Sequence, residues 1–347
     1  MKKINVLITG AGSGVGQSII KSLNISKLPL RIISADISEL NAGLYRTDKS
    51  IIIPKVESYG SLKRIISIIK KNKIDILMIG SEYELSFFGK NKDIIEKKSN
   101  CIVCVTDRDI IRFSEDKYLT QQFLKNLNFP FLKTYIPKNL QDAHKIIKKM
   151  KYPFYLKNRF GTSSRKVFLI KHKKQLELYF SQLKKPIIQE YAGSFSEDTL
   201  KNEFTCSFFK TKEKKIIGPF IAKRRLLNGT SWITEVKEFP KIRKLIKKIA
   251  EKINHVGSMN IQLRQSKKGP VPFEFNARFS GTTSIRAKFG FNEPEMFIKN
   301  FYLNKNIKNP KIKHGVTLRY IEEIFLINAS IKKLKTKFGK GLINQWF

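Results

Sequence analysis

Residues Gly257–Gly281 read GSMNIQLRQSKKGPVPFEFNARFSG and predict two strands joined by a short basic turn. Apolar and polar residues alternate in both strands, and side chains two residues apart share one face of a strand. If the strands pair as a hairpin, Gln262, Glu274 and Asn276 converge on one polar surface, with Arg278 beyond them. The opposite, apolar face is then expected to carry Met259, Ile261, Leu263, Phe273, Phe275 and Phe279.

The polar face of this hairpin carries oxygen donors. Gln262, Glu274 and Asn276 offer carboxylate and amide oxygens, which a hard cation such as Mg²⁺ prefers. An octahedral Mg²⁺ held by few protein ligands keeps coordination positions for phosphates. The solvated outer face of an amphipathic hairpin gives the same alternation, so the pattern alone leaves both interpretations open.

The sequence of the second strand resembles a known signature. Residues Glu274–Gly281, EFNARFSG, are similar to the E-x-N-P-R-x-S motif of the ATP-grasp superfamily, and most similar to the branch that contains the large subunit of carbamoyl-phosphate synthetase. The resemblance implies that Gln262, Glu274 and Asn276 hold Mg²⁺ or Mn²⁺ between the phosphates of ATP. It also implies that Arg278 is catalytic and steadies the transferred phosphoryl group or the substrate oxyanion. Ala277 replaces the usual proline without touching a ligand.

A second region has chemistry suited to phosphates. The apolar strand Tyr152–Lys157 ends in a lysine and is followed by a loop rich in Gly, Ser and Thr, residues 158–165. The lysine supplies a point charge, and the loop supplies backbone N–H and hydroxyl donors. The pattern resembles the family's Y-P-x-x-x-K-P element, with Asn158 in place of proline, and implies that Lys157 is both catalytic and ATP-binding.

Three further segments resemble ATP-binding elements in the family's order. The helix predicted over 114–126 resembles its D-K helix, residues 186–191 its adenine-binding hinge, and residues 203–205 the element whose glutamate binds ribose. Glu197 is a rival for the ribose role. The resemblance implies that the ATP-binding residues are Lys117, Lys157, Ser163, Ser164, Glu190, Tyr191, Ala192 and Glu203.

The N-terminal part predicts a doubly wound α/β domain. A strand at Ile4–Ile8 leads into a Gly-rich turn, Thr9–Gly16, then a helix and a second strand that ends at Asp36. The turn fits the short-chain reductase form of the dinucleotide fingerprint, so an NAD-dependent reductase is an alternative. The Y-x-x-x-K pair of such enzymes occurs only at Tyr45/Lys49 and Tyr59/Lys63, far too early. Residues 41–54 instead resemble the pre-ATP-grasp domain of the carbamoyl-phosphate synthetase branch.

The expected fold class is α/β, with a Rossmann-like pre-ATP-grasp domain followed by a two-subdomain α+β ATP-grasp fold. The expected domains are a pre-ATP-grasp domain at 1–107, the ATP-grasp lid subdomain at 108–190, and a C-terminal subdomain at 191–347. The last of these carries the metal site and a basic tail.

Composition places further bounds on the function. The chain has 347 residues, 41% of them hydrophobic, and a net charge of +40. A charge of that size suggests nucleic-acid binding as a rival function. The lysines are spread over the whole length, however, which is more typical of a solvated surface than of one binding face.

The cysteines argue for a reducing compartment, because three of them make no disulfide framework. Cys101 and Cys104 form a C-x-x-C in an apparent strand, where positions three apart point to opposite faces, so we expect no shared metal or redox role. No apolar run suits a membrane span, and we expect a cytoplasmic protein.

The resemblance implies an ADP-forming carboxylate–amine ligase that depends on ATP and Mg²⁺ or Mn²⁺. In such enzymes a small carboxylic acid is activated as an acylphosphate and then joined to an amine. The expected partners are small-molecule carboxylate and amine substrates, with a homodimer left open. A kinase-type or carbamoyl-phosphate-type activation of a small acid is the alternative on the same fold.

Overall fold

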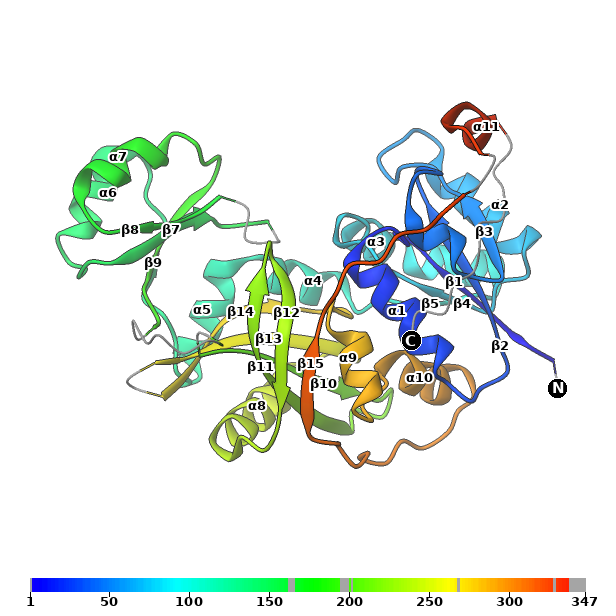
Figure 1. Cartoon of the computed structure of the whole chain (residues 1–347). Coiled ribbons are helices and arrows are strands. Elements are labelled where there is room, and N and C mark those ends of the chain that lie inside the picture. Colours follow the sequence, from blue (N-terminus) through cyan, green and yellow to red (C-terminus); the bar gives the residue numbers. More distant parts are fainter. Residues whose placement is uncertain are drawn as a thin grey trace.

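The computed structural model describes residues 2–161, 166–193, 200, 202–266, 269–326 and 329–336, and Figure 1 shows their arrangement. The N-terminal part forms a five-stranded parallel sheet in the order β3-β2-β1-β4-β5. Its strands are β1 (Ile4–Ile8), β2 (Leu30–Asp36), β3 (Lys49–Ile52), β4 (Ile76–Met78) and β5 (Ile102–Cys104). The intervening helices are α1 (Gly14–Asn24), the short η1 (Ala42–Tyr45), α2 (Ser61–Lys71) and α3 (Glu82–Ser99). The predicted doubly wound sheet is confirmed.

Both faces of this sheet are buried, which explains the continuous apolar runs of its strands. Val6 and Ile8 belong to one core cluster, which continues into the C-terminal part of the chain. Leu7 belongs to a second cluster under α2 and α3. Cys101 and Cys104 also divide between the two sides, since Cys101 is in the second cluster and Cys104 packs on the first. Burial raises the pKa of Cys101 to about 12 and raises that of Cys104 as well, so neither thiol is poised for redox chemistry.

A buried carboxyl group beside the Gly-rich turn allows a stability prediction. Thr9 Oγ1 donates to Glu84 Oε2 at 2.6 Å, and burial, together with nearby Asp36 and Glu57, raises the pKa of Glu84 from 4.5 to about 7. The folded protein therefore binds more protons than the unfolded chain between these pH values, and Glu84 costs stability as the pH rises through that window. Glu84→Gln should raise the free energy of unfolding above neutral pH by on the order of 1–3 kcal/mol, and should change it little near pH 4.

Urea unfolding of both proteins at the two pH values measures this difference. An equal change at acid and alkaline pH would show that the ionisation of Glu84 is not the cause.

The middle of the chain forms a separate lobe with a four-stranded antiparallel sheet, ordered β6-β9-β7-β8 (Figure 1). The strands are β6 (Thr134–Tyr135), β7 (Phe154–Asn158), β8 (Val167–Ile170) and β9 (Pro186–Glu190). Helices α6 (Leu140–Ile147) and α7 (Lys173–Phe180) pack on the sheet, where Ala143 and Leu176 join a core with Phe154, Leu156 and Ile188. The other face of the lobe is left for the cleft described below.

The C-terminal part forms a six-stranded antiparallel sheet in the order β14-β13-β10-β11-β12-β15. Its strands are β10 (Glu203–Lys210), β11 (Ile216–Leu227), β12 (Thr230–Val236), β13 (Gly257–Ser266), β14 (Gly269–Asn276) and β15 (Gly315–Leu318). Its helices are α8 (Pro240–Lys252), α9 (Thr283–Lys288), α10 (Glu293–Phe297), the π-helix η2 (Ile298–Tyr302) and α11 (Ile331–Thr336). Together with the four-stranded sheet, it gives the expected mixed α/β fold.

Helices α4 (Arg108–Glu115) and α5 (Lys117–Asn126) pack against the C-terminal sheet. The rings of Phe113 and Phe123 contact Phe275 of β14 edge-on, with centroids 5.8 and 6.5 Å apart. We therefore propose that the lid subdomain begins after α5 and not at residue 108. Within the described residues, no helix has the length and apolar character to cross a membrane.

Candidate active site

The predicted hairpin is present as β13 and β14, and its register brings the expected oxygen donors together. Gln262 lies opposite Glu274, and Asn260 lies opposite Asn276. Glu274 Oε1 accepts hydrogen bonds from Gln262 Nε2 at 3.3 Å and from Asn276 Nδ2 at 3.2 Å. The three side chains thus meet at one point on the face of the sheet. Two residues of the turn, Lys267 and Lys268, lie outside the described residues.

The hairpin contains a β-bulge that the alternation of residues did not predict. The register shifts after Gln262, so that Leu263 lies opposite Pro272 and Phe273 is the extra residue of β14. Phe273 therefore leaves the core that holds Phe275 and lines the cleft beside Lys157, and its predicted place on the apolar face is wrong. Pro272 was the available signal, because proline has no N–H for the ladder and is tolerated in strands at bulges.

Strands β10 and β11 extend the polar face with a charged triad. The register sets Glu203 between Arg224 and Arg264, and the ion pairs are 2.9 and 3.0 Å long. Arg224 Nη2 also donates to Gln262 Oε1 at 2.8 Å. Burial disfavours the ionised form of Glu203, but the two guanidinium groups outweigh it and hold the pKa of this carboxyl below its usual range. Arg264 was not among the predicted site residues.

Arg278 links the metal-ligand candidates to the N-terminal domain. Its Nη2 donates to Asn276 Oδ1 at 2.9 Å and to Glu82 Oε2 at 2.8 Å, while its Nη1 donates to the carbonyl of Phe279 at 2.8 Å. Glu82 is the first residue of α3, far away in the sequence. The side chain of Arg278 is thereby held at the junction of two domains, beside the donors on β14.

The two lysines predicted to bind phosphate, Lys117 and Lys157, line the same part of the cleft. Asp116 caps α5 and forms an ion pair of 2.6 Å with Arg159, which follows β7. This contact brings Lys117, the first residue of α5, to the loop after β7, where its Nζ donates to the carbonyl of Gly161 at 2.5 Å. Lys117 and Lys157 are both buried and line one cavity with Gln262 and Glu274.

The environment of Lys157 disfavours the charged form of its side chain. Its Nζ lies 6.0 Å from the ring centroid of Phe273. Burial, together with the charges of Lys117 and Arg264 and against the opposing effect of Glu274, lowers the pKa of Lys157 to about 7. An anion that binds beside a buried cation of this kind stabilises its charged form.

The cleft between the four-stranded and six-stranded sheets has an apolar end and a charged end. Leu132, Ala192 and Phe273 line the apolar end, and Gln189 lines it beside them. The carboxylate of Glu190 accepts a hydrogen bond from the backbone N–H of Lys133 at 3.2 Å and does not line the cavity.

The other residues predicted to bind adenine are Tyr191 and Ala192. Tyr191 packs against Tyr155, with ring centroids 5.5 Å apart. The roles of Glu190, Tyr191 and Ala192 toward adenine stay predictions. Ser163, Ser164 and Glu197 lie outside the described residues.

The donor chemistry at Glu274 fits magnesium. No group of three His, Cys, Asp or Glu side chains in the described parts of the chain is arranged to hold a metal. Gln262, Glu274 and Asn276 supply one carboxylate and two amides, a set too small to fill an octahedral shell but suited to an ion that shares phosphate ligands. Lys157 on the facing wall, and Lys117, line the same cavity as Gln262 and Glu274.

The Gly-rich turn is packed in a way that disfavours a dinucleotide. Asp36, which lies where a dinucleotide-binding turn would have its ribose-binding acid, accepts hydrogen bonds from the Gly12 N–H and from Asn41 Nδ2, both at 2.7 Å. A Cβ at Gly12 would collide with Asn41, and one at Gly43 would collide with the carbonyl of Ala11. The glycines thus serve the close approach of residues 41–43 to the turn.

The rim of this turn faces the candidate metal ligands across a cavity of about 280 Å³, which we call the interdomain cavity. Its lining from the N-terminal domain includes Gly14 and Glu82. The C-terminal sheet contributes Arg224 and Glu274, and the loop after β14 contributes Arg278. The interdomain cavity therefore adjoins the charged end of the cleft, since Gln262 and Glu274 line both.

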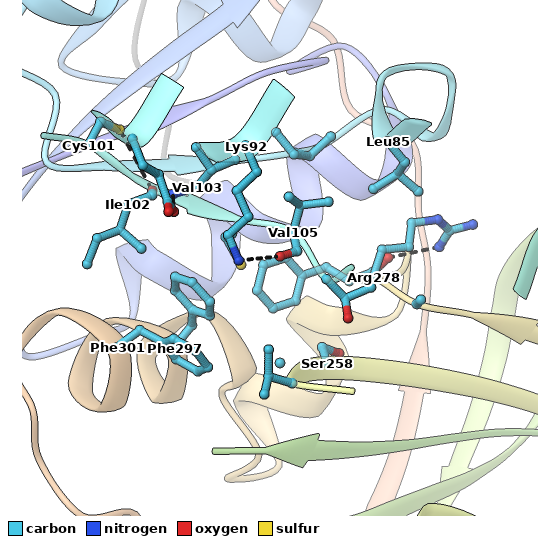
Figure 2. Close-up of a pocket in the computed structure, with 18 of the residues that line it drawn as sticks. Leu85, Lys92, Cys101, Ile102, Val103, Val105, Ser258, Arg278, Phe297 and Phe301 are labelled. Carbon is cyan, nitrogen blue, oxygen red and sulfur yellow. Dashed lines mark hydrogen bonds between the residues drawn. The ribbon is translucent and has the colours of Figure 1, made fainter. Parts of the chain in front are cut away.

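A larger cavity of about 500 Å³ lies on the other side of Arg278, between β5 and η2 (Figure 2). Most of the lining residues that Figure 2 labels are apolar, among them Leu85, Val103, Val105 and Phe297. Lys92 Nζ donates to the carbonyl of Val105 at 3.2 Å, within the N-terminal domain. The cavity presents no cluster of reactive groups.

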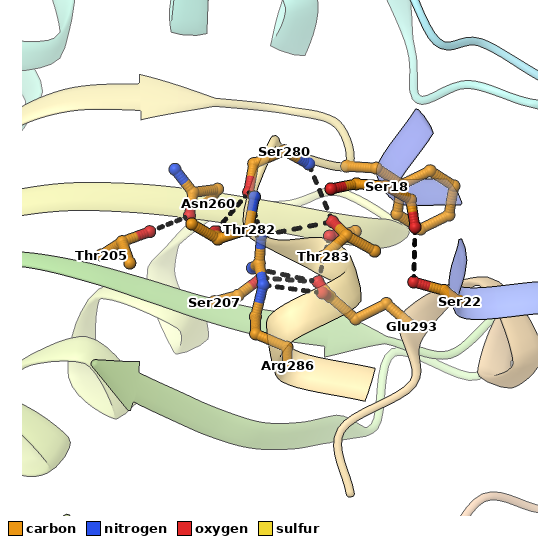
Figure 3. Close-up of polar contacts among 12 residues, drawn as sticks. Ser18, Ser22, Thr205, Ser207, Asn260, Ser280, Thr282, Thr283, Arg286 and Glu293 are labelled. Carbon is orange, nitrogen blue, oxygen red and sulfur yellow. Dashed lines mark hydrogen bonds and ion pairs between the residues drawn. The ribbon is translucent and has the colours of Figure 1, made fainter. Parts of the chain in front are cut away.

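A buried ion pair supports the loop after Arg278 (Figure 3). Arg286 and Glu293 are 1% and 0% exposed, with Nε and Oε2 3.2 Å apart. Arg286 Nη2 donates to the hydroxyls of Ser280 and Thr282, and Glu293 Oε1 accepts from Ser207 Oγ at 2.6 Å. The network fixes residues 280–283 against the sheet.

Glu293→Ala should lower the free energy of unfolding by about 3–5 kcal/mol, because it leaves the Arg286 guanidinium buried without its counter-charge. Denaturant unfolding measures the loss. The double variant Arg286→Met/Glu293→Leu is the control and should recover much of it. A loss below about 1 kcal/mol in the single variant, the size of an exposed pair, would contradict a dry pair at this position.

Comparisons with known proteins agree with this geometry. Three family models match successive parts of the chain: "PylC-like, N-terminal domain" over residues 6–103, "RimK-like ATP-grasp domain" over 114–200, and "ATP-grasp in the biosynthetic pathway with Ter operon" over 199–324. No curated protein matches the chain.

Solved structures share the fold at low sequence identity. Biotin carboxylase from Campylobacter jejuni has a TM-score of 0.73 at 16% identity, covering 92% of this chain and 76% of its own. N5-carboxyaminoimidazole synthetase from Staphylococcus aureus, complexed with ADP, has a TM-score of 0.70 at 17% identity, covering 91% and 82%. N5-carboxyaminoimidazole ribonucleotide synthetase from Thermus thermophilus has a TM-score of 0.71 at 12% identity, covering 92% and 84%.

The two ATP-grasp models together span residues 114–324, which include both sheets of the cleft and all the described candidate site residues. The models matched here are not those of carbamoyl-phosphate synthetase, so the placement in that branch stays a prediction. With the hairpin, the lysine pair and the shared fold, these matches show that the chain belongs to the ATP-grasp superfamily of ligases.

Proposed function

We propose that the protein is an ATP- and Mg²⁺-dependent, ADP-forming ligase that activates a small carboxylic acid as an acylphosphate and joins it to an amine. One observation carries the proposal. The oxygen donors Gln262 and Glu274 line the same cavity as Lys117 and Lys157, and Asn276 is hydrogen-bonded to Glu274. An oxygen-rich metal site beside buried cations is the arrangement that phosphoryl transfer from ATP requires.

Each wall of the cleft has a part in holding the nucleotide. Lys117 and Lys157 would bind phosphate oxygens, and the apolar end at Leu132, Ala192 and Phe273 would enclose the base. Gln262, Glu274 and Asn276 would hold Mg²⁺, which neutralises phosphate charge when bound. Glu203 lies in the same cavity and is available to ribose hydroxyls while its two arginines keep it ionised.

The chemistry needs no side-chain nucleophile. A carboxylate oxygen of the acid attacks the γ-phosphorus, the bond to the β,γ-bridging oxygen breaks, and ADP leaves. The amine nitrogen then attacks the carbonyl carbon, the bond from this carbon to the phosphorylated oxygen breaks, and phosphate departs with one oxygen from the acid and takes up the proton that the amine loses. Arg278, which lines the interdomain cavity, is placed to neutralise charge on the transferred group.

The interdomain cavity is where the acid would reach the γ-phosphate, since it contains both Glu274 and Arg278. A biotin carboxylase domain of 2-oxoglutarate carboxylase from Hydrogenobacter thermophilus, similar at a TM-score of 0.70 and 13% identity, holds MgADP and bicarbonate. Bicarbonate therefore belongs among the acids to be tested.

An isotope experiment tests the proposal. ADP release is measured over a panel of carboxylic acids and amines, and the productive acid is then supplied with ¹⁸O in its carboxylate. The proposed route transfers one ¹⁸O to inorganic phosphate and leaves the other in the product amide. ADP release that needs no amine and leaves an acylphosphate would support the kinase-type alternative. Phosphate without ¹⁸O, or ADP release that no acid stimulates, would refute acyl activation.

A further inference from the structure

A second cavity, of about 460 Å³, lies beside the interdomain cavity and is basic. It is enclosed by α1, by α9 and by the segment that follows β15. Four cationic residues line it, Lys21, Arg46, Lys288 and Arg319, and Glu322 is the one carboxylate among the described residues of its lining. We call it the basic cavity.

Arg319 connects the two cavities, because it lines both of them. Its Nε donates to the carbonyl of Ser231 and its Nη2 to that of Gly281, each at 3.0 Å. Ser231 and Gly281 belong to the lining of the interdomain cavity. A fixed guanidinium thus stands where the basic cavity meets the cavity that contains Arg278.

Helices α1 and α9 are held together along this boundary. Ser18 Oγ donates to the carbonyl of Gly281 at 2.9 Å and lies 3.1 Å from Ser284 Oγ. One turn further along each helix, Lys21 and Lys288 line the basic cavity. The position of both lysines is therefore set by the same contact that closes the loop after Arg278.

The four cations of the basic cavity differ in exposure: Arg46 is buried, Lys21 and Arg319 are half-buried, and Lys288 is exposed. Arg46 is 6% exposed and lies 3.3 Å from Glu322. Burial lowers the pKa of Lys21, and nearby Arg319 and Arg46 lower it further, while burial also lowers the pKa of Arg319. Like charges held close together at partly buried positions raise the free energy of the protein, and a bound anion lowers it again.

From this arrangement, and resting on the proposed function, we propose that the acid substrate carries a second anionic group, a carboxylate or a phosphate ester. This group binds in the basic cavity while the reacting carboxylate lies beside Arg278. Ile285, Phe289 and Leu318 give the basic cavity an apolar side, which suits the carbon chain between the two charged ends. The preferred substrate is thus an elongated dianion.

Matched pairs of acids test the preference. Aliphatic monocarboxylates are compared with dicarboxylates of equal chain length, and with acids that carry a terminal phosphate ester, in the ADP-release assay. The second anionic group should raise kcat/KM by about tenfold or more, since a hydrogen bond to a charged group contributes at least that factor. The two dianion series distinguish a carboxylate from a phosphate.

The double variant Lys21→Met/Lys288→Met should lose this preference, mainly through a higher KM. Lys63→Met, on the exposed face of α2, is the control and should keep it. Equal kcat/KM for monoanions and dianions, or an undiminished preference in the double variant, would overturn the proposal.

A binding measurement separates this inference from the proposed function. Calorimetry with inorganic phosphate and with a dicarboxylate is carried out on the full chain saturated with MgADP, so that no turnover is needed. We expect binding of at least one of them to the wild type and a loss of about tenfold or more in the double variant. Absence of binding, or equal binding to both proteins, would refute the basic cavity as an anion site even if ADP release is observed.

Discussion

Glu274→Gln should reduce acid-dependent ADP release by about 10³-fold or more while leaving the fold intact. Glutamine keeps the size of the side chain and one oxygen, but it removes the single carboxylate from the donor set with Gln262 and Asn276. Those two residues supply only neutral oxygens, so the variant cannot compensate the charge of Mg²⁺. The contacts of the hairpin, in contrast, tolerate an amide, because Glu274 acts there as a hydrogen-bond acceptor.

The measurement is ADP release at saturating MgATP, with MgATP affinity followed separately by calorimetry. Glu251→Gln, on the exposed end of α8, is the matched control and should be fully active. Turnover of Glu274→Gln within about threefold of the wild type, far from the loss expected for an electrostatic group, would remove Glu274 from the site.

Lys157→Met should weaken nucleotide binding strongly and at the same time stabilise the protein without nucleotide. The lysine is buried with a pKa of about 7, well below its ordinary value of 10.5. Since the unfolded chain binds the extra proton between these values, the cost of burying the charge is complete below pH 7 and fades as the pH rises toward 10.5. Methionine fills a similar volume without that cost, so the gain should be on the order of 1–3 kcal/mol at acid pH and smaller at alkaline pH.

Two readouts are needed for this variant. Urea unfolding at several pH values gives the stability, and calorimetry with MgATP gives the affinity, which should fall by about 100-fold or more with the loss of a charged contact in a dry site. Lys171→Met, at an exposed position of the lid, should change neither. A stabilised variant that still binds MgATP normally would show that Lys157 is a structural residue only.

Much of the site followed from periodicity in the sequence. An alternation of two placed Gln262, Glu274 and Asn276 on one face, and the structure brings them into contact as expected. The same rule placed Phe273 on the wrong face, because one extra residue in a strand changes which face the neighbouring side chains occupy. Pro272 is compatible with a bulge, but the neighbouring sequence does not show which residue is the extra one.

Residues that depend on several strands at once could not be found from the sequence. Arg224 and Arg264 become site residues only because β11, β10 and β13 align them on either side of Glu203. Glu82 reaches Arg278 across a gap of 196 positions. At the hinge, alternation along β9 decides that Gln189 lines the cleft and that Glu190 turns toward Lys133. Short sequence motifs contain no information on such registers.

Because Arg278 contacts Glu82, the N-terminal domain of this protein could not be replaced freely by that of a related ligase. Because the arginine beside the candidate metal ligands is held by a carboxylate from the N-terminal domain, that domain is part of the active site's framework. Ser18 and Asn292 add further bonds across the same boundary, to Gly281 and to the carbonyl of Ser22. A chimera that takes its first hundred residues from another ligase would therefore need an acid at position 82, or Arg278 would be left without this support.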